Sequence, residues 1–301
     1  MSTSVMIEAD GLCKQFGSFL AVRDVSFSIP KGQVVAFLGP NGAGKTTTMR
    51  LLTGFVAPTH GSARIAGIDV QSDRIRAAEH LGYLPENGPL YPDMSPLSLL
   101  KFFGEARGLM GAKLHSRVDA VVGQCALDSV AHKPIGKLSK GYRQRVSMAQ
   151  ALLHDPEVLI MDEPTSGLDP VMTEEVLQAT ADLAASDGVT VFFSSHQLSE
   201  VEQICDRVCL IDEGQAIIDG VLDDLKEQYR RIVLVFDAEP PREVGSLPGV
   251  DHLRRTGRTV SLLAHEQVDE LVQRARALGP HSVEVKPVAL KELFLDQVRG
   301  E

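Results

Sequence analysis

The sequence QVVAFLGPNGAGKTTTMRLLTGF, residues 33–55, contains the pattern that decides how the chain folds. An apolar run, a glycine-rich turn and a stretch with helical periodicity follow one another directly. This order predicts a buried strand, a tight loop and a helix. The turn from Gly39 to Thr46 matches G-x-x-x-x-G-K-[ST], in which backbone N–H groups and a helix N-terminus surround a phosphate. The segment therefore predicts a phosphate-binding loop.

The side chains of this loop predict that it binds the phosphates of a nucleotide together with Mg²⁺. Lys45 would neutralise β- and γ-phosphate oxygens, and the Thr46 hydroxyl would ligate Mg²⁺. The remaining loop positions expected to contact nucleotide are Gly39, Asn41, Gly42, Ala43, Gly44 and Thr47. A glycine-rich turn could match the pattern by chance, but the flanking strand and helix disfavour that alternative.

A second motif, VLIMDE at residues 158–163, consists of four apolar residues followed by two carboxylates. It predicts a buried central strand that presents Asp162 at its carboxyl end, where open α/β sheets bind ligands. Asp162 would hold Mg²⁺ through water, and Glu163 would act as the general base on the attacking water. Solvated acids at the end of a strand are the alternative, which the nearby phosphate-binding loop disfavours.

The segment LSKGYRQR, residues 138–145, begins a predicted helix and resembles the LSGGQ-type signature of ABC ATPases. The resemblance implies that Ser139 and Gly141 reach nucleotide bound by a second copy of the chain, so that ATP holds a homodimer together. Ser139 can also cap the helix, whose dipole would face an anion. Lys140 replaces the first glycine of the signature and Tyr142 the usual glutamine, and the segment by itself would also suit a polar helix cap.

The same resemblance implies roles for three further residues. Asp169, in SGLD at 166–169, belongs to a loop that links the two sites of a dimer. His196 follows the apolar run TVFFSS and resembles the switch histidine that contacts the γ-phosphate and positions Glu163. Phe16 corresponds to the aromatic residue that stacks on adenine, for which only a π face is needed; packing into the core is the alternative.

Glu86 stands where the family usually has glutamine, in GYLPE at residues 82–86. Its oxygen could still contact Mg²⁺ or the water, although a carboxylate adds charge beside Glu163. Together with the signature, this segment resembles the branch that serves type-2 ABC exporters, whose ATPase and membrane subunits are separate chains.

The order of strands and helices predicts an α/β fold with two domains. Alternating strands and helices in residues 1–224 predict a mainly parallel sheet covered on both faces. The resemblance to ABC ATPases implies that this sheet is the phosphate-loop NTPase core of ABC type. Residues 5–30 predict an antiparallel β subdomain, and residues 86–156 a helical signature subdomain. Residues 225–301 predict a small α+β accessory domain with three strands, a helix over 266–278 and a closing helix in ALKELFLDQV.

Composition limits where the protein acts. A net charge of -10 argues against nucleic-acid binding, which needs clustered Lys and Arg. No apolar run approaches the roughly 20 residues that cross a bilayer, the N-terminus does not resemble a signal peptide, and the four cysteines show no paired or metal-ligand spacing. These features predict a cytoplasmic protein that reaches the inner face of the membrane through a partner.

The sequence therefore predicts an ATPase subunit that powers a membrane ABC transporter, with export favoured over import. Its membrane subunit is expected to dock near residues 86–96, although this loop could simply pack on its own helical subdomain. A soluble ABC protein acting on ribosomes or DNA is disfavoured, because such proteins normally carry two cassettes or a long coiled coil. The chain shows one phosphate-binding loop and no heptad run.

Overall fold

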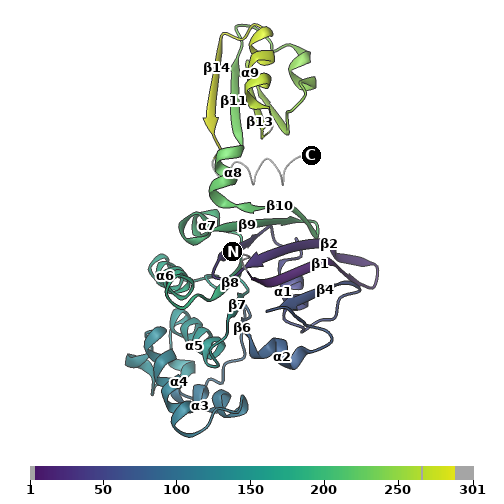
Figure 1. The fold of residues 1–301 in the computed structure, drawn as a ribbon. Helices are drawn as coiled ribbons and strands as arrows, with labels where there is room; N and C mark the ends of the chain where they lie inside the picture. The colour runs from purple at the N-terminus through teal and green to yellow at the C-terminus, as the bar shows by residue number, and fades with distance from the viewer. Residues whose placement is uncertain (1–3, 266, 289–301) are drawn as a thin grey trace. The chain divides into compact units, whose positions relative to one another are not determined.

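The computed structural model describes residues 4–265 and 267–288, and its contacts divide the chain into two compact units, Met1–Asp219 and Gly220–Glu301 (Figure 1). The division precedes the boundary expected after residue 224. Helix α8 (Leu222–Gln228) falls in the second unit, and Arg230 of the following strand donates through Nη1 to the carbonyl oxygen of Lys226 in α8 at 2.9 Å.

The first unit contains a six-stranded sheet in the order β10-β9-β3-β8-β7-β6. Its strands are β3 (Val34–Leu38), β6 (Leu81–Leu84), β7 (Val158–Met161), β8 (Thr190–Ser195), β9 (Arg207–Asp212) and β10 (Gln215–Val221). The pairs β3–β8, β3–β9, β7–β8 and β6–β7 are parallel. Every residue of β3, β7 and β8 is buried, as expected for strands covered on both faces. The predicted α/β core is confirmed.

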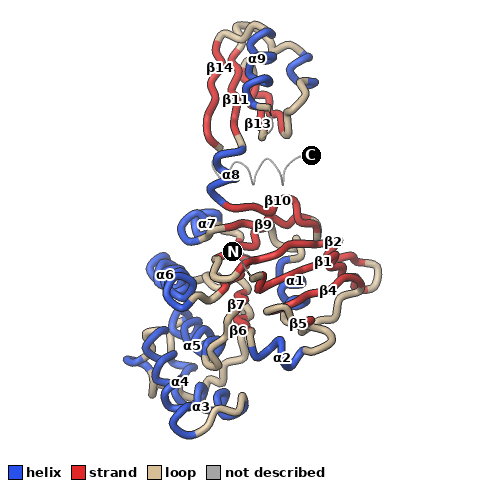
Figure 2. Tube along the Cα trace, viewed as in Figure 1, coloured by secondary structure: helices blue, strands red, loops and turns tan. Residues whose placement is uncertain are grey.

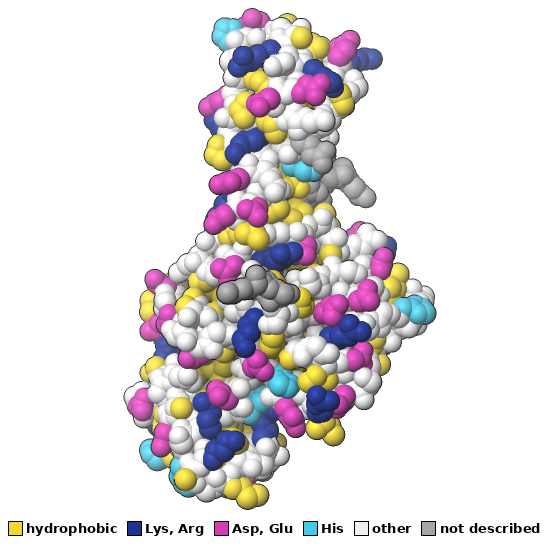
Figure 3. Space-filling model, viewed as in Figure 1, with side chains coloured by type: hydrophobic (Ala, Val, Ile, Leu, Met, Phe, Trp, Pro, Cys, Tyr) yellow, Lys and Arg dark blue, Asp and Glu magenta, His cyan; other side chains and the backbone are white. Residues whose placement is uncertain are grey.

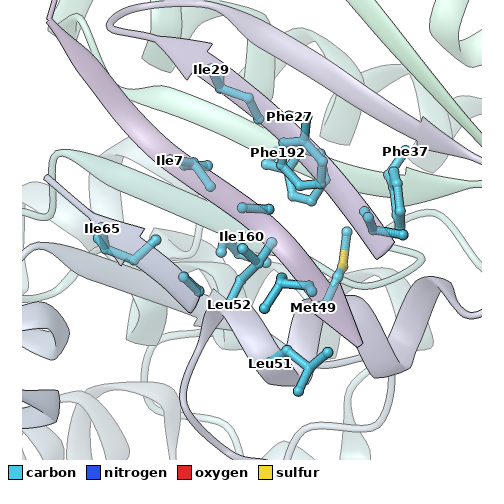
Figure 4. Packing of buried hydrophobic residues seen from close by; sticks show 14 of the residues in the cluster. Ile7, Phe27, Ile29, Phe37, Met49, Leu51, Leu52, Ile65, Ile160 and Phe192 are labelled. Carbon is cyan, nitrogen blue, oxygen red and sulfur yellow. The ribbon is translucent and has the colours of Figure 1, made fainter. Parts of the chain in front are cut away.

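A second sheet of the first unit, in the order β2-β1-β4-β5, is the predicted antiparallel subdomain. It consists of β1 (Val5–Phe16), β2 (Phe19–Pro30), β4 (His60–Ile65) and β5 (Ile68–Asp69). Figure 4 shows how its apolar side chains and those of α1 (Lys45–Leu52) meet the central sheet. Phe27 and Phe192 pack with ring centroids 5.3 Å apart, and Met49 of α1 is completely buried in the same cluster. This packing fixes the helix that follows the phosphate-binding loop.

The first unit has further helices besides α1. They are α2 (Arg74–Glu79), α3 (Pro96–Ala106), α4 (Gly111–Gln124), α5 (Lys140–Leu152), α6 (Pro170–Asp187) and α7 (Leu198–Ile204), with 3-10 turns at Asp128–Val130 and Ile135–Lys137. Helices α3, α4 and α5 gather away from the antiparallel sheet (Figure 2), as the predicted helical subdomain requires. Helix α4 buries Leu114, Val118, Val121 and Val122 along one face. Within the described residues, no helix is both long and apolar enough to span a membrane.

The second unit has a four-stranded antiparallel sheet in the order β12-β13-β11-β14. Its elements besides α8 are β11 (Arg230–Val235), a 3-10 turn (Arg242–Ser246), β12 (His252–Thr256), β13 (Thr259–Ala264), α9 (Val268–Ala277) and β14 (Ser282–Pro287). Leu271 and Ala275 of α9 are buried against this sheet, with Val268 and Val272 beside them, as the helical spacing predicts. Strand β12 was not predicted, and the expected closing helix lies outside the described residues.

Candidate active site

A cavity of 380 Å³ lies at the carboxyl ends of the parallel strands, beside the loop between β3 and α1. Its lining residues are Phe19, Ala21, Asn41, Gly42, Gly44, Lys45, Thr46, Thr47, Glu86, Glu163, Ser166 and His196. Segments far apart in the sequence therefore meet at the edge of the sheet where the motifs predicted a site.

Two glycines give the loop its shape. Gly42 and Gly44 have φ angles of 86° and 106°, a region that favours glycine. A Cβ at Gly44 would lie 2.7 Å from the Ala21 carbonyl oxygen, so the loop can pack against β2 only without a side chain there. Apart from the two chain neighbours, no atom of the described residues lies within 4 Å of the position of a Cβ at Gly42, which leaves its backbone open to a ligand in the cavity.

Lys45 is held at the centre of the loop. Its side chain is almost completely buried, and Nζ donates to the carbonyl oxygens of Gly39 at 2.8 Å and Pro40 at 3.2 Å. Nζ also lies 3.4 Å from Oε1 of Glu163. A buried ammonium in this position supplies the positive charge that a phosphate oxygen needs.

Ser194 of β8 links the two carboxylates that follow β7. Its Oγ donates to Oδ1 of buried Asp162 at 2.7 Å and accepts a hydrogen bond from the backbone N–H of Glu163 at 2.8 Å. Glu163 has a φ of 48°, an uncommon backbone conformation for a residue other than glycine. The serine thus fixes both acids, a role that the sequence analysis missed.

Glu163 and His196 form a direct pair at the mouth of the cavity. Nδ1 of His196 lies 2.8 Å from Oε2 of Glu163, while the other carboxylate oxygen faces Lys45. The Glu163 side chain is mostly buried and that of His196 is about half exposed. Held from both sides, this carboxylate has the fixed orientation that a general base requires.

The residues expected to hold Mg²⁺ offer hydroxyl and carboxylate oxygen atoms as ligands. Thr46 and Glu86 line the cavity, whereas Asp162 does not; Ser194 links Asp162 to Glu163, which does line it. Hydroxyl and carboxylate oxygens are the donors Mg²⁺ prefers, usually one or two from protein with the rest from phosphates and water. Across residues 4–265 and 267–288, no cluster of three His, Cys, Asp or Glu side chains offers a metal site made by protein alone. The donor set fits a metal bound together with a nucleotide.

Ser139 and Asp169 lie outside the residues that line the cavity. Ser139 caps α5 by accepting from the backbone N–H of Tyr142 at 3.3 Å, and Asp169 caps α6 by accepting from Met172 at 3.0 Å. A Cβ at Gly141 would lie 2.4 Å from Sδ of Met172, so these two helix N-termini are neighbours. The structure therefore brings the signature and the segment of Asp169 close to each other. Neither Ser139 nor Asp169 lines the cavity that contains Lys45.

Phe19 lines the cavity, and the predicted Phe16 is not among its lining residues. The two residues are directly paired at the end of the β1–β2 hairpin, and both are exposed. Nζ of Lys14 lies 5.0 Å from the centroid of the Phe16 ring. Adenine stacking by Phe16 stays a prediction, and Phe19 is a second aromatic residue that the sequence analysis missed.

A larger cavity of 660 Å³ lies between α5 and α6 and contains none of the predicted site residues. Arg145 in its wall forms an ion pair with Glu175. Burial raises the pKa of the Cys125 thiol there to about 12, so the thiol stays protonated and is a poor nucleophile. The predicted site residues gather instead at the smaller cavity.

Comparison with protein families gives two matches. The family described as "ABC transporter" matches residues 22–166, which include the phosphate-binding loop, the signature and the two carboxylates. A family described as "AAA domain, putative AbiEii toxin, Type IV TA system" matches residues 133–202. Both matches cover parts of the site described above.

Known proteins resemble the chain over most of its length. It is 34% identical over 295 residues to the Nod factor export ATP-binding protein I of Cupriavidus pinatubonensis, covering 97% of this chain and 90% of that one. It is 37% identical over 223 residues to the probable multidrug ABC transporter ATP-binding protein YbhF of Escherichia coli, covering 74% of this chain but only 38% of YbhF. The dimeric structure of MJ0796, a bacterial ABC transporter cassette, superposes with a TM-score of 0.66 at 25% identity, over 72% of this chain and 99% of that one.

Proposed function

The chain belongs to the ABC transporter family of ATP-binding proteins, and we propose that it binds and hydrolyses ATP to power a membrane transporter. The observation that carries this proposal is the convergence of Lys45, Glu163 and His196 on one cavity, with Asp162 fixed beside it by Ser194. These are the groups that phosphoryl transfer to water needs: a cation for phosphate, a base for water and a carboxylate for the metal.

Nucleotide would bind with its phosphates on the loop from Gly39 to Thr47. The backbone of Gly42 and the ammonium of Lys45 would contact phosphate oxygens, assisted by the N-terminus of α1. When bound through Thr46, Asp162 and Glu86, Mg²⁺ would neutralise negative charge on the phosphates. Phe16 or its neighbour Phe19 would stack on the adenine.

Hydrolysis would depend on the pair Glu163 and His196. Glu163 would accept a proton from the attacking water, and its hydrogen bond with His196 would keep the carboxylate aimed at that water. Lys45 would remain on the other side of the carboxylate and move no proton. A fixed arrangement of this kind lowers the barrier by orientation as well as by proton transfer.

We infer a homodimer from the separation of the two halves of the site. Ser139 and Asp169 stand at helix N-termini, which favour anions, yet they do not line the cavity of their own chain. A second copy arranged head to tail would place them opposite the bound phosphates, as the resemblance of the signature implies. The MJ0796 cassette is dimeric, which supports dimer formation by this chain.

The proposed partner is a membrane subunit on a separate chain that docks near residues 86–96. Tyr91 in this loop and Phe102 of α3 have exposed fractions of 49% and 48%, and their rings meet edge to face with centroids 6.3 Å apart. Exposed aromatic rings of this kind serve as anchors in protein interfaces. Such a partner would hold the protein at the cytoplasmic face of the membrane.

Export is the proposed direction of transport, supported by the export role in the name of the Cupriavidus relative. The chain spans only 38% of the length of YbhF, so the substrate of that protein gives no guide to the substrate here. Import by the same kind of cassette is the second candidate.

Replacing the general base tests the proposal. Glu163→Gln should retain ATP binding, lower hydrolysis by about 10²–10⁴-fold and accumulate an ATP-bound dimer, because the base is lost while the binding groups remain. Size-exclusion chromatography with ATP and a phosphate-release assay measure these effects. Glu79→Gln, an exposed position on α2, is the matched control. Hydrolysis at the wild-type rate by Glu163→Gln would contradict the assigned role.

A further inference from the structure

The loop that carries His196 is held by a buried pair, Ser195 and Glu200, that has no part in the scheme above. Ser195 ends β8 and Glu200 lies in the first turn of α7, with exposed fractions of 1% and 3%. Oγ of Ser195 donates to Oε2 of Glu200 at 2.7 Å. This hydrogen bond joins the strand to the helix on either side of the histidine.

Two backbone interactions complete the link. The N–H of Gln197 donates to Oγ of Ser195 at 2.9 Å, and the N–H of Glu200 donates to the carbonyl oxygen of Gln197 at 3.2 Å. Together these bonds enclose the backbone of His196. The imidazole itself is about half exposed, so this enclosure rather than burial of the ring restricts where Nδ1 can lie.

Burial of Glu200 in α7 has a cost in folding free energy. Among the described residues, Oε1 of Glu200 has no hydrogen-bond partner, although burying a polar oxygen without one is unfavourable. A negative charge in the first turn of a helix interacts favourably with the helix dipole. Because exposed acidic residues already give this stabilisation, it does not explain why Glu200 is buried. An apolar side chain would cover the inner face of α7 at lower cost.

We propose that Glu200 is a positioning residue which, through Ser195, holds His196 at hydrogen-bond distance from Glu163. The inference rests on the proposed function, because the pair matters only if Glu163 activates water. The carboxylate of Glu200 fixes the Ser195 hydroxyl, the hydroxyl fixes the turn at Gln197, and the turn fixes the imidazole. Displacement of a catalytic geometry by about 1 Å costs on the order of 100-fold in rate.

Three variants of the full chain test the link. Glu200→Met and Ser195→Ala should lower kcat on the order of 10- to 100-fold and leave ATP affinity unchanged, because neither residue lines the cavity. Glu200→Gln retains an oxygen that accepts from Ser195 and should keep most of the activity. Glu202→Met changes an exposed glutamate of the same helix and is the control. Ser195→Ala alone decides the matter if Glu200→Met does not fold.

Two further measurements separate positioning from a general structural role. In a His196→Ala background, Glu200→Met should cause no additional loss in single-turnover hydrolysis, because the histidine that it positions is gone. Hydrogen exchange at the Gln197 amide should accelerate in Ser195→Ala and in Glu200→Met. Wild-type kcat in Ser195→Ala, or an equal loss with and without His196, would overturn the inference. Failure of the proposed function would show differently, as absent hydrolysis in the wild-type chain.

Discussion

Single side chains determine what each copy of the chain can do alone. Lys45 lies in the cavity and contacts Glu163, whereas Ser139 caps a helix elsewhere on the surface of the same unit. Removing Lys45 should therefore weaken ATP binding by the chain that carries the change. Changing Ser139 should affect only nucleotide held by a partner copy.

A mixing experiment checks this division of roles. Ser139→Arg should bind ATP with near wild-type affinity but fail to turn it over, because the bulky cation blocks approach of a second copy. Mixing it with a Lys45→Ala chain should restore at most one working site per heterodimer. Filter binding and steady-state hydrolysis at several mixing ratios provide the measurement. Loss of ATP binding by the Ser139→Arg chain alone would contradict the assignment in trans.

At the scale of elements, His154 joins the end of α5 to the start of β6. Its Nε2 lies 3.1 Å from the carbonyl oxygen of Leu81. Burial, aided by the positive charge of Arg107, lowers the pKa of His154 to about 4 from an ordinary value of 6.5. The folded protein therefore keeps this imidazole neutral at pH values where the unfolded chain takes up a proton.

This difference predicts a pH dependence of stability. The contribution of neutral His154 is complete above pH 6.5 and is lost as the pH falls from 6.5 towards 4, because only the unfolded state gains the proton. The urea midpoint of the wild-type chain should fall across this range, and that of His154→Gln should fall less. His132→Gln, at an exposed histidine, is the control. Parallel pH profiles for wild type and His154→Gln would rule out the effect.

Helix α3 and the loop before it are the elements assigned to the membrane partner. Phe102→Ala should leave folding and ATP affinity unchanged, because its ring contacts Tyr91 and Phe103 on the surface rather than the core. Binding of the membrane subunit, measured by co-purification, should fall, and so should any stimulation of hydrolysis by it. Ile75→Ala, a more exposed apolar residue on α2, should change neither. Normal partner binding by Phe102→Ala would place the docking surface elsewhere.

The sequence predicts correctly the strands and helices that have a clear local pattern of apolar residues. It does not predict a strand such as β12, which is defined by its pairing with another strand. Strand β3, its loop and α1 follow from one apolar run and one motif, and β7 and β8 from runs that are buried on both faces. Strand β12, with the sequence HLRRT, lies at a sheet edge and is largely exposed, so it has no alternating apolar pattern. Its pairing with β13 alone defines it.

The same distinction explains what was missed in the site. Lys45, Asp162 and Glu163 lie in motifs whose chemistry is local. Ser194 forms its hydrogen bond with Asp162, which is remote from it in the sequence. Only the pairing of β7 with β8 places the two side chains together. A serine at the end of a buried apolar strand is a weak signal for such a bond. Likewise, the position of Phe19 follows from the register of a hairpin.

At the scale of the whole molecule, the candidate site lies in the first unit, and the second unit has a separate hydrophobic core. The groups that line the cavity all precede residue 197. The second unit buries its own cluster, which includes Ile232, Leu262 and Leu271. Lys and Arg side chains are interspersed with Asp and Glu on the face of that unit shown in Figure 3. Mixed charge suits an accessory role better than a binding cleft for one charged ligand.

We therefore expect the first unit to fold and to bind ATP by itself. A chain that ends after Val221 keeps β10, the edge strand beside β9, and removes α8 together with the sheet of the second unit. It should melt cooperatively and bind ATP with an affinity close to that of the full chain, because every residue lining the cavity remains. Dimer formation or coupling to the membrane partner should weaken if the second unit supports them. Calorimetry and nucleotide titration of both chains provide the measurement, with Lys45→Ala in the shortened chain as the control for specific binding. A shortened chain that aggregates or cannot bind ATP would mean that the two units depend on a shared core.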